Sequence, residues 1–346
     1  MVTQRDIARI AGVDQGTVSY ALHGKGTLSK ATRDRVLRVS RRLKYRPNAN
    51  ALSLRTARSD LIGLVIAPLS NPFQAQLAQA MADAVGRHGC RLMLSVTWGD
   101  DREHRYQMMK LLDQRAAGVI VAAVDERLSH ATLDTLRGRM PLVVLGPPGK
   151  FESVWIDKEA CGHELGKHLL ASGRRRIVAV VDRTASRGRY DAKTRGLSRA
   201  LRDAGQRLMG TIELDRSLLD DPVEDWGCLL ADHLLERYPH ADAAFAGSDV
   251  VAISLVSRLL ERGVRVPADI AVAGFDDIPQ ARWAPVPLTT IRQPIQAYAA
   301  EAARLLFDQL DPRGDGQVAA PVRLACDLVV RASTDPTWRR DDERAQ

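Results

Sequence analysis

Apolar residues in the first 45 positions recur every three or four residues, which predicts three short helices around a small core. Thr3 and Asp6 have the spacing of a capping box at the start of the first helix, and Gly12 supplies the turn after it. Asp14 and Ser29 are expected to cap the second and third helices. The residues expected to face inward are Ile7, Ala8, Ile10, Ala11, Val13, Val18, Ala21, Leu22, Val36, Leu37, Val39 and Leu43.

The second of these helices has a polar outer surface. That surface is expected to hold Gln15, Gly16, Thr17, Ser19 and Tyr20. Two helices joined by a glycine-containing turn, with hydrogen-bonding side chains on the outer face of the second, are typical of a helix-turn-helix, whose second helix enters the DNA major groove. An ordinary pair of helices at the start of a globular domain would show the same pattern.

The distribution of charge favours the DNA-binding interpretation. Residues 1–59 contain thirteen Lys and Arg against three Asp, a net charge of +10, whereas the whole chain carries +8. The excess positive charge therefore lies entirely in the N-terminal sixth of the chain. A localised basic module of this kind is expected to bind phosphates by counterion release.

A short segment after the third helix is expected to act as a hinge. Arg46-Pro47-Asn48 ends that helix, and Asn48 is placed to cap one more helix over residues 49–55. An isolated helix needs about 12 residues to be stable in water. We therefore expect residues 47–60 to form a hinge helix and linker that is only marginally helical in the free protein.

From residue 61 onward, short apolar runs alternate with longer amphipathic segments, and the pattern restarts near residue 160. Near-continuous apolar strands separated by helices predict parallel sheets covered on both faces. The number of strands predicts two doubly wound α/β subdomains with a ligand cleft between them. The expected strands are 61–67, 91–96, 118–123, 142–145, 177–181, 243–246, 270–275 and 322–330, and the expected helices are 73–88, 103–115, 129–137, 160–172, 194–204, 225–237, 250–261 and 295–310.

These patterns give a complete domain prediction. The chain is an α/β protein with an N-terminal three-helix helix-turn-helix headpiece at 1–46, followed by the hinge at 47–60. The N-terminal effector-binding subdomain is expected at 61–160 plus 292–321, and the C-terminal one at 161–291 plus 322–333. Residues 334–346 are expected to be a disordered tail because they are charged and carry few apolar residues.

Composition excludes several classes of protein. No apolar run reaches membrane length, and charged residues stand where a signal peptide would need an apolar stretch, so we expect a cytoplasmic location and no membrane partner. The four cysteines, Cys90, Cys161, Cys228 and Cys326, are widely spaced, which favours buried reduced thiols over disulfides or a metal site. Gly-x-Ser-x-Gly, Walker and Gly-x-Gly-x-x-Gly motifs are missing, so no enzyme activity and no cofactor are expected.

Several short motifs, in order and at consistent spacing, carry a resemblance that covers nearly the whole chain. The chain resembles the LacI/GalR family of bacterial transcription regulators. The motifs are Val-Thr-Gln-Arg-Asp-Ile-Ala at 2–8, Ala-Gly-Val at 11–13, Thr-Val-Ser-Tyr at 17–20, Tyr-Arg-Pro-Asn-Ala at 45–49, Gly-Leu-Val at 63–65, Asn-Pro-Phe at 71–73, Gly-Ser-Asp at 247–249, Val-Pro-Ala-Asp-Ile at 266–270, Gly-Phe-Asp-Asp at 274–277 and Leu-Thr-Thr-Ile-Arg-Gln-Pro at 288–294.

The resemblance implies a DNA-binding headpiece, a hinge helix and a core like that of periplasmic sugar-binding proteins, which binds a small effector and dimerises. A homodimer implies a palindromic double-stranded DNA operator. Residues 335–346 contain no apolar heptad, so a dimer is expected rather than a coiled-coil tetramer. A periplasmic-type transport component sharing the core is the alternative function, but it would need an export signal and no basic headpiece.

Within the headpiece, the resemblance assigns individual DNA contacts. Gln15 and Gly16 match the two positions whose contacts most often distinguish one operator from another. Tyr20 is the next residue on that face and is expected to contact a base or a phosphate. Gln can bind adenine through two hydrogen bonds, whereas Gly has no side chain with which to contact a base. Leu54 matches a hinge leucine that wedges into the minor groove. The alternative is that Leu54 packs against the same helix of the second subunit. The expected positioning contacts are Thr3, Thr17, Ser19, Lys30 and Arg33, and Asn48 begins the hinge helix.

In the core, Phe73 and Trp226 are expected to present flat apolar faces to a sugar ring, although Trp226 would fit core packing equally well. Asp276 follows a predicted strand and is expected to accept hydrogen bonds from hydroxyl groups, while Asp277 beside it suggests that one of the two caps a helix. Lys193 stands where the family usually has an arginine. The remaining polar candidates are Gln74, Ser248, Asp249 and Gln293. The expected effector is a sugar or sugar derivative, and Arg187 and Arg189 raise the chance that it is phosphorylated or acidic.

Overall fold

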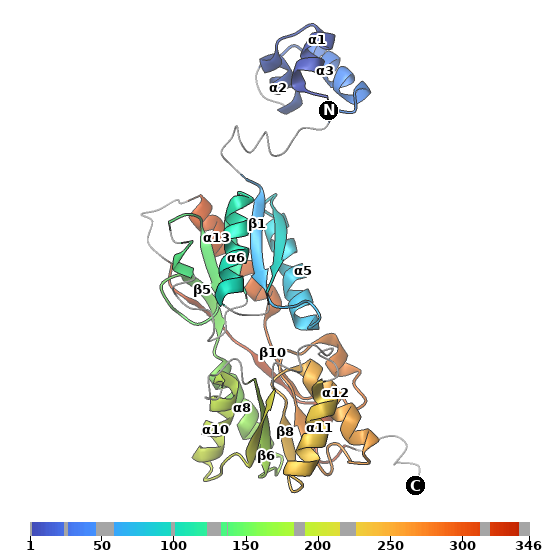
Figure 1. The fold of residues 1–346 in the computed structure, drawn as a ribbon, viewed down its shortest axis with the longest axis vertical. Coiled ribbons are helices and arrows are strands. Elements are labelled where there is room, and N and C mark those ends of the chain that lie inside the picture. The colour runs from blue at the N-terminus through green and yellow to red at the C-terminus, as the bar shows by residue number, and fades with distance from the viewer. Residues whose placement is uncertain are drawn as a thin grey trace. The chain divides into compact units, whose positions relative to one another are not determined.

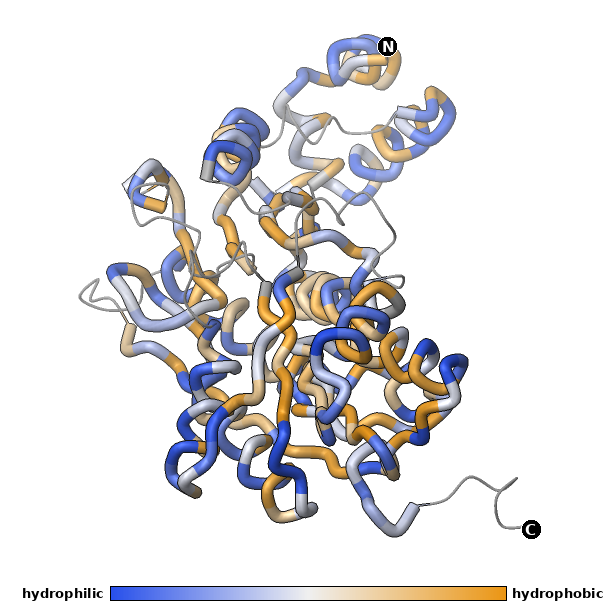
Figure 2. Tube along the Cα trace, turned by 60° about the horizontal axis from the view of Figure 1, so that its bottom comes forward, coloured by the Kyte–Doolittle hydropathy of each residue, from blue (hydrophilic) through white to orange (hydrophobic). Residues whose placement is uncertain are grey.

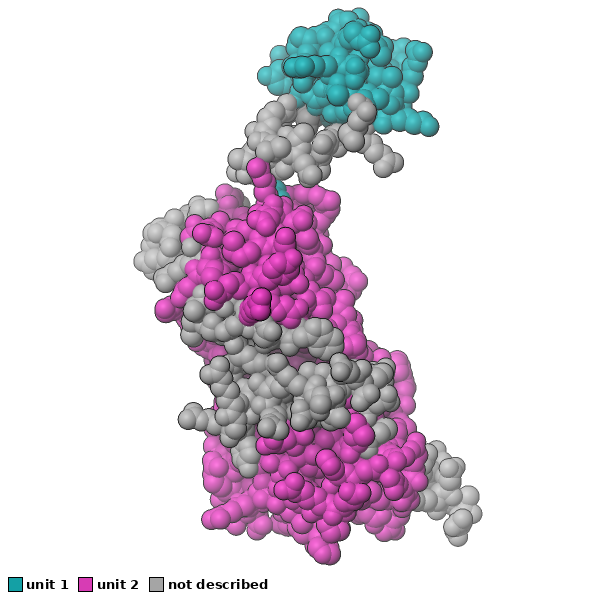
Figure 3. Space-filling view, in the orientation of Figure 1, with its two compact units in different colours: residues 1–59 teal, residues 60–346 magenta. Residues whose placement is uncertain are grey.

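The computed structural model describes residues 2–23, 27–45, 59–97, 101–122, 133–136, 138–182, 191–214, 226–311 and 319–338. It divides into two compact units, Met1–Ser59 and Asp60–Gln346 (Figure 3). Nearly all of the predicted hinge, including Asn48 and Leu54, lies outside the described residues, as do Arg187 and Arg189. No helix in the described ranges is long and apolar enough to cross a membrane.

The first unit contains the three predicted helices, α1 (Gln4–Ala11), α2 (Gln15–His23) and α3 (Lys30–Arg42). Their caps are confirmed. The Asp6 amide donates to Thr3 Oγ1 at 3.3 Å, and the Thr3 amide donates back to the Asp6 carboxylate at 2.9 Å. Gly12 has a φ of 64°, and the caps at Asp14 and Ser29 accept from the Thr17 and Thr32 amides. The core holds Ile7, Ala8, Ala11, Val18, Ala21 and Val36.

Three predicted orientations in this unit are wrong. Ile10 is 48% exposed, because it lies about 100° around the helix from the centre of the stripe formed by Ile7, Ala8 and Ala11. Ser19 was expected to face outward but is only 7% exposed, because a side chain this small is easily covered by its neighbours. On α3, Leu37 is only half-buried, and Ser40 is buried in its place.

The second unit contains two parallel sheets, as predicted. In the described chain the first sheet has the order β11 (Val322–Leu324), β5 (Glu152–Ile156), β4 (Leu142–Leu145), β3 (Gly118–Val121), β1 (Leu61–Ile66) and β2 (Arg91–Val96). Helices α5 (Pro72–Gly86) and α13 (Ile295–Leu310) pack on one face of this sheet, and α6 (Asp101–Asp113) packs on the other (Figure 1). Hydrophobic residues are concentrated on the strands (Figure 2), and the buried residues of α5 and α13 are also hydrophobic.

The second sheet has the order β7 (Gly210–Leu214), β6 (Ile177–Asp182), β8 (Ala243–Phe245) and β9 (Ala271–Ala273). Figure 1 shows α8 (Lys158–Ala171) and α10 (Ala192–Asp203) on one side of β6 and β8, with α11 (Trp226–Arg237) and α12 (Asp249–Glu261) on the other. Both sheets are therefore covered by helices on their two faces. The carboxyl ends of their strands are the expected place for a ligand.

Three strands were not predicted, namely β5, β7 and β10 (Thr290–Arg292). Strand β5 contains Glu152, a polar residue that interrupts the apolar run although it is buried. Its carboxylate accepts hydrogen bonds from the Gln309 side chain at 2.9 Å and the Ala319 amide at 3.0 Å, partners more than 150 residues away in the chain. Burial of this glutamate depends on tertiary partners that the local pattern does not reveal.

The predicted strand at 322–330 is two strands. β11 pairs in parallel with β5 in the first sheet, whereas β12 (Asp327–Val329) pairs antiparallel with β10. The chain therefore leaves the first sheet after Leu324, and the predicted domain boundary between residues 321 and 322 is placed too early.

The predicted disordered tail begins too early as well. Thr334 closes the short helix η3 (Ala332–Thr334) and is fully buried, and its hydroxyl hydrogen-bonds with Thr289 and with His168 at 2.7 Å each. Trp338 packs against the main hydrophobic core. Hydrogen bonds therefore hold Thr334 and core packing holds Trp338, and residues 339–346 lie outside the described chain.

Candidate nucleic-acid interface and ligand cleft

The outer face of α2 presents Gln15, Gly16 and Tyr20. Gln15 and Gly16 are exposed in the first turn, and Tyr20 is 53% exposed one turn further on. Thr17 donates its amide and its hydroxyl to the Asp14 carboxylate at 2.8 and 2.6 Å, and these hydrogen bonds lower the pKa of Asp14. Gln15 and Tyr20 are therefore the α2 side chains with the most freedom to contact a base.

The predicted positioning residues differ in how freely they can bind phosphate. Lys30 is exposed at the start of α3, and Arg33 is half-buried with its Nε hydrogen-bonded to nothing in the described chain. The Thr3 hydroxyl already donates to Asp6 Oδ2 at 2.8 Å. The side chain of Ser19 is buried, so a phosphate contact through its hydroxyl is not available in this conformation.

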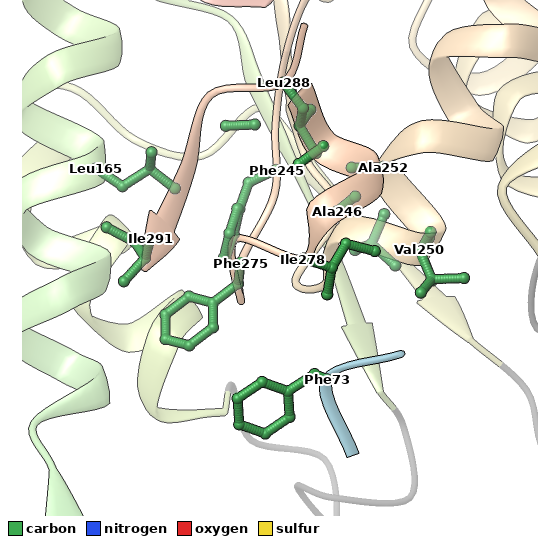
Figure 4. Close-up of a cluster of buried hydrophobic side chains, with 14 of the residues drawn as sticks. Phe73, Leu165, Phe245, Ala246, Val250, Ala252, Phe275, Ile278, Leu288 and Ile291 are labelled. Carbon is green, nitrogen blue, oxygen red and sulfur yellow. The ribbon is translucent and has the colours of Figure 1, made fainter. Parts of the chain in front are cut away.

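A cavity of about 530 Å³ in the second unit brings most of the predicted effector residues together. It lies at the carboxyl ends of strands from both sheets, where open α/β folds bind ligands. The predicted residues that line it are Phe73, Gln74, Lys193, Ser248, Asp276 and Gln293. Phe73 enters from α5 on the first sheet and Phe275 follows β9 of the second, and Figure 4 shows both rings.

Asp276 is held in a strained and buried position at the end of the second sheet. Its φ is 127°, a value that residues other than glycine rarely adopt, and the residue is only 7% exposed. Its Oδ1 accepts a hydrogen bond from Gln293 Nε2 at 2.6 Å. Burial, followed by the nearby carboxylate of Asp249, raises the pKa of Asp276 to about 7. Strain of this kind at a cavity wall is typical of a residue fixed for binding.

The two neighbouring carboxylates serve the fold. Asp249 is fully buried, accepts from the Thr290 hydroxyl and the Ile278 amide at 2.5 and 2.9 Å, and has its pKa raised to about 6 mainly by burial. Asp277 pairs at 2.6 Å with both Arg292 and Arg331. Although burial alone would raise it, hydrogen bonds from these arginines lower the pKa of Asp277.

The expectation that Asp276 or Asp277 caps a helix is wrong. The short helix that follows them, η2 (Pro279–Arg282), has Ile278 at its N-cap and no side-chain capping bond. Asp277 is instead bound by two arginines.

Lys193 occupies the cavity wall at the start of α10. Its Nζ donates to the Gly247 carbonyl at 2.6 Å, lies 4.0 Å from the Asp191 carboxylate and sits 4.9 Å from the centre of the Phe275 ring. The position is set by close packing of α8 on α10, because a Cβ on Gly162 would overlap the Lys193 carbonyl. Only glycine permits this approach of the two backbones.

Two polar groups on the cavity wall are left available for a ligand. Gln74 Oε1 is buried and, within the described ranges, accepts no hydrogen bond. Ser248 is the N-cap of α12, but its side chain makes no capping hydrogen bond. A buried acceptor without a donor is costly, so a ligand hydroxyl at Gln74 would repay part of that cost.

Trp226 does not join this group. It begins α11, and the described residues around the cavity do not include it; it packs instead against the margin of the main core. Other lining residues were not predicted, among them Asn71, Trp155, Asp157, Asp191 and Tyr298. Asn71 belongs to the Asn-Pro-Phe motif already noted, whereas Tyr298 lies inside a helix whose sequence carries no signal of a site.

Comparison with known proteins bears on both sites. Residues 3–48 match the family described as bacterial regulatory proteins, lacI family, and residues 167–334 match the periplasmic binding protein-like domain. The transcriptional regulator DegA of Bacillus subtilis is 30% identical over 338 residues, covering 96% of this chain and 97% of DegA. The regulator CelR of Thermobifida fusca is 32% identical, covering 94% of this chain and 96% of CelR.

A solved structure titled as the transcriptional regulator CelR in complex with cellobiose is also similar. It has 29% sequence identity and a TM-score of 0.67, and the match covers 96% of this chain and all of that one. The similarity therefore extends over the headpiece and the core together.

Proposed function

We propose that this chain, which belongs to the lacI family of bacterial regulatory proteins, is a repressor that binds a palindromic operator as a homodimer and is controlled by a sugar or sugar derivative held in the cleft. Its membership makes it a DNA-binding transcription regulator with an effector-binding core, and not an enzyme. The proposal adds the repressor role, the dimer and the class of effector.

The observation that carries the effector class is the lining of the cavity. It combines a strained, buried carboxyl at Asp276 and a buried acceptor at Gln74 with donors at Lys193 and Ser248. A polyhydroxylated ligand supplies both donors and acceptors, and the rings of Phe73 and Phe275 offer flat apolar surface for its carbon face. The structure titled as CelR with cellobiose supports a sugar by likeness.

The balance of charge favours a neutral sugar over a phosphorylated one. Among the described lining residues, four are acidic and three are basic. Of the basic groups, Lys193 is engaged by Gly247 and Asp191, and Arg195 lies 3.6 Å from Glu159. A phosphate needs several uncommitted donors, and the engaged cations supply few.

An exposed edge supports the homodimer. Strand β2 ends the first sheet, and on it Leu94 and Val96 are 41% and 37% exposed. An edge strand with exposed apolar residues is a template for pairing unless something covers it. A second copy of this chain against β2 would give the assembly two headpieces, as a palindromic operator requires.

A thermal-shift screen of the full-length protein against neutral sugars, sugar phosphates and nucleobases tests the effector class. We expect one neutral sugar to raise the unfolding temperature, since a ligand that binds only the folded state stabilises it by mass action. A shift with phosphorylated sugars alone would contradict the proposed class. Selection of bound sequences from random DNA should return a palindrome, and a lack of enriched sequence would contradict operator binding.

A further inference from the structure

Two cysteines that are 165 positions apart in the sequence lie side by side in the structure. Both residues are half-buried on the wall of a cavity of about 580 Å³, and each is close enough to the other to shift the pKa of its thiol. These two residues, Cys161 and Cys326, are free thiols, as is Cys90. The cavity wall also holds Asp157, Glu164 and Arg323, so the pair is next to a polar space that a small molecule can enter.

The pair stands where the chain passes between the two sheets. Cys161 lies in the first turn of α8, directly after β5, and Cys326 lies between β11 of the first sheet and β12, the partner of β10. The segment that leads from β11 to β12 is already held against α8. The Arg323 side chain donates a hydrogen bond to Asp157 at 2.9 Å, and Asp157 caps α8.

The thiol pair also lies close to the effector cavity. Asp157 lines both cavities. Tyr298, a buried lining residue of the effector cavity, is near enough to both cysteines for them to affect it, and burial with these neighbours raises the pKa of the Tyr298 phenol. A change in the bonding of the two sulfurs therefore acts on the wall of the effector cavity.

We propose that Cys161 and Cys326 form an oxidisable dithiol site, at which a small peroxide converts the pair into a disulfide that restricts movement of the two subdomains. The chain is then sensitive to oxidants as well as to its effector. Formation of the disulfide depends on the position of the two sulfurs and not on the proposed effector.

The two thiols have different roles in this step. The interaction with Cys326 and the charge of Arg323 lower the pKa of Cys161, whereas the interaction with Cys161, followed by burial, raises the pKa of Cys326. Cys161 also lies in the first turn of α8, where the positive end of the helix dipole favours a thiolate. The thiolate is the nucleophile in thiol oxidation, so Cys161 is the attacking sulfur. Cys326 is the second thiol, which closes the disulfide.

The chemistry balances with hydrogen peroxide as oxidant. The Cys161 thiolate attacks one peroxide oxygen, the O–O bond breaks, and the products are a sulfenic acid and hydroxide, which takes up a proton to give water. The Cys326 sulfur then attacks the sulfenic sulfur, the S–O bond breaks, and the Cys326 proton leaves with the hydroxyl as a second water. Two thiols and one peroxide thus give one disulfide and two waters, and an added dithiol reverses the reaction.

The test treats full-length protein with a few equivalents of hydrogen peroxide, alkylates the remaining thiols and maps the peptides by mass spectrometry. We expect the loss of two of the four thiols, a peptide pair joined through Cys161 and Cys326, and full recovery after dithiothreitol. Four thiols that stay reduced, direct conversion to sulfonic acids, or disulfides between chains would overturn the proposal.

Matched variants separate the two sulfurs. Cys326→Ser should stop at a sulfenic acid on Cys161, trapped by dimedone, and Cys161→Ser should leave Cys326 unmodified at the same peroxide dose. Cys90→Ser is the control and should form the disulfide as the unmodified chain does. Loss of the disulfide in Cys90→Ser, or a disulfide that forms without Cys161, would contradict the assignment.

The consequence for regulation rests on the proposed function and is measured separately. In the oxidised protein, the effector sugar should change operator affinity several-fold less than in the reduced protein, and dithiothreitol should restore the response. A disulfide that forms but leaves the effector response unchanged would overturn the restriction of movement alone. An operator affinity that no sugar changes, even in the reduced protein, would instead count against the proposed function.

Discussion

Replacing Asp276 with Asn separates ligand binding from stability. The Asn side chain has nearly the same shape, and its oxygen can still accept the 2.6 Å hydrogen bond from Gln293. The second carboxylate oxygen becomes an amide that donates. A sugar hydroxyl that donated to the carboxylate then loses its acceptor, and hydrogen bonds to charged groups are worth about 1.5 to 3 kcal/mol. The effector Kd should therefore rise roughly 10- to 150-fold.

The same substitution should stabilise the core above neutral pH. Because the pKa of Asp276 is raised from 3.8 to about 7, the folded protein binds a proton that the unfolded chain releases between these values. The contribution of this group to stability is present in full below about pH 4 and is lost as pH rises to about 7. Asp276→Asn should unfold at a higher temperature than the unmodified protein at pH 8, and at a similar temperature at about pH 3.5.

Asp277→Asn is the matched control, because Asp277 is adjacent in sequence but does not line the cavity. Its carboxylate is 2% exposed and pairs with Arg292 and Arg331. Its loss should cost about 3 kcal/mol of stability, near the lower end for a broken buried pair because Arg292 is partly exposed. The effector Kd should stay unchanged.

Thermal unfolding at the two pH values and calorimetric titration with the identified sugar measure both effects. A destabilised Asp276→Asn that keeps its effector affinity would refute the reasoning. An equal loss of affinity in both variants would refute it as well.

Three further predictions concern DNA binding and assembly. Gln15→Ala should lose about 1 to 3 kcal/mol of binding free energy on the selected operator only. Arg33→Ala should weaken binding to all DNA and reduce the slope of log affinity against log salt concentration by about one. Equal losses on specific and random DNA would contradict these roles. Light scattering at micromolar concentration should show a dimer, because the tail has no heptad for a tetrameric coiled coil. A tetramer would contradict this prediction. Leu54→Ala should weaken operator binding without changing the unfolding temperature, and amides of residues 48–55, which lie outside the described chain, should exchange freely until operator is added.

The sequence predicts the headpiece and the ligand cleft through local signals. Thr3 and Gly12 mark helix ends through hydrogen bonding and φ, which depend on neighbours within four residues. Six of the expected effector residues lie on one cavity because parallel strands bring their carboxyl ends to the same edge.

What the sequence does not reveal depends on distant partners. Glu152 is buried in β5 because Gln309 satisfies its carboxylate, and no local pattern contains that information. Cys161 and Cys326 were expected as unrelated buried thiols, yet the chain crossing after β11 brings them together. Trp226 has the residue type expected of a sugar platform, but its position is set by the packing of α11 on the core.

Operator binding measured by fluorescence anisotropy with increasing effector tests the central claim most directly. The claim is that the cleft and the headpiece are thermodynamically coupled, so saturating sugar should change the operator Kd by at least about fivefold, the lower range of allosteric coupling. The effector Kd should change by the same factor when operator is bound, because linkage is reciprocal. A sugar that binds tightly in the cleft and leaves the operator Kd unchanged would contradict the account.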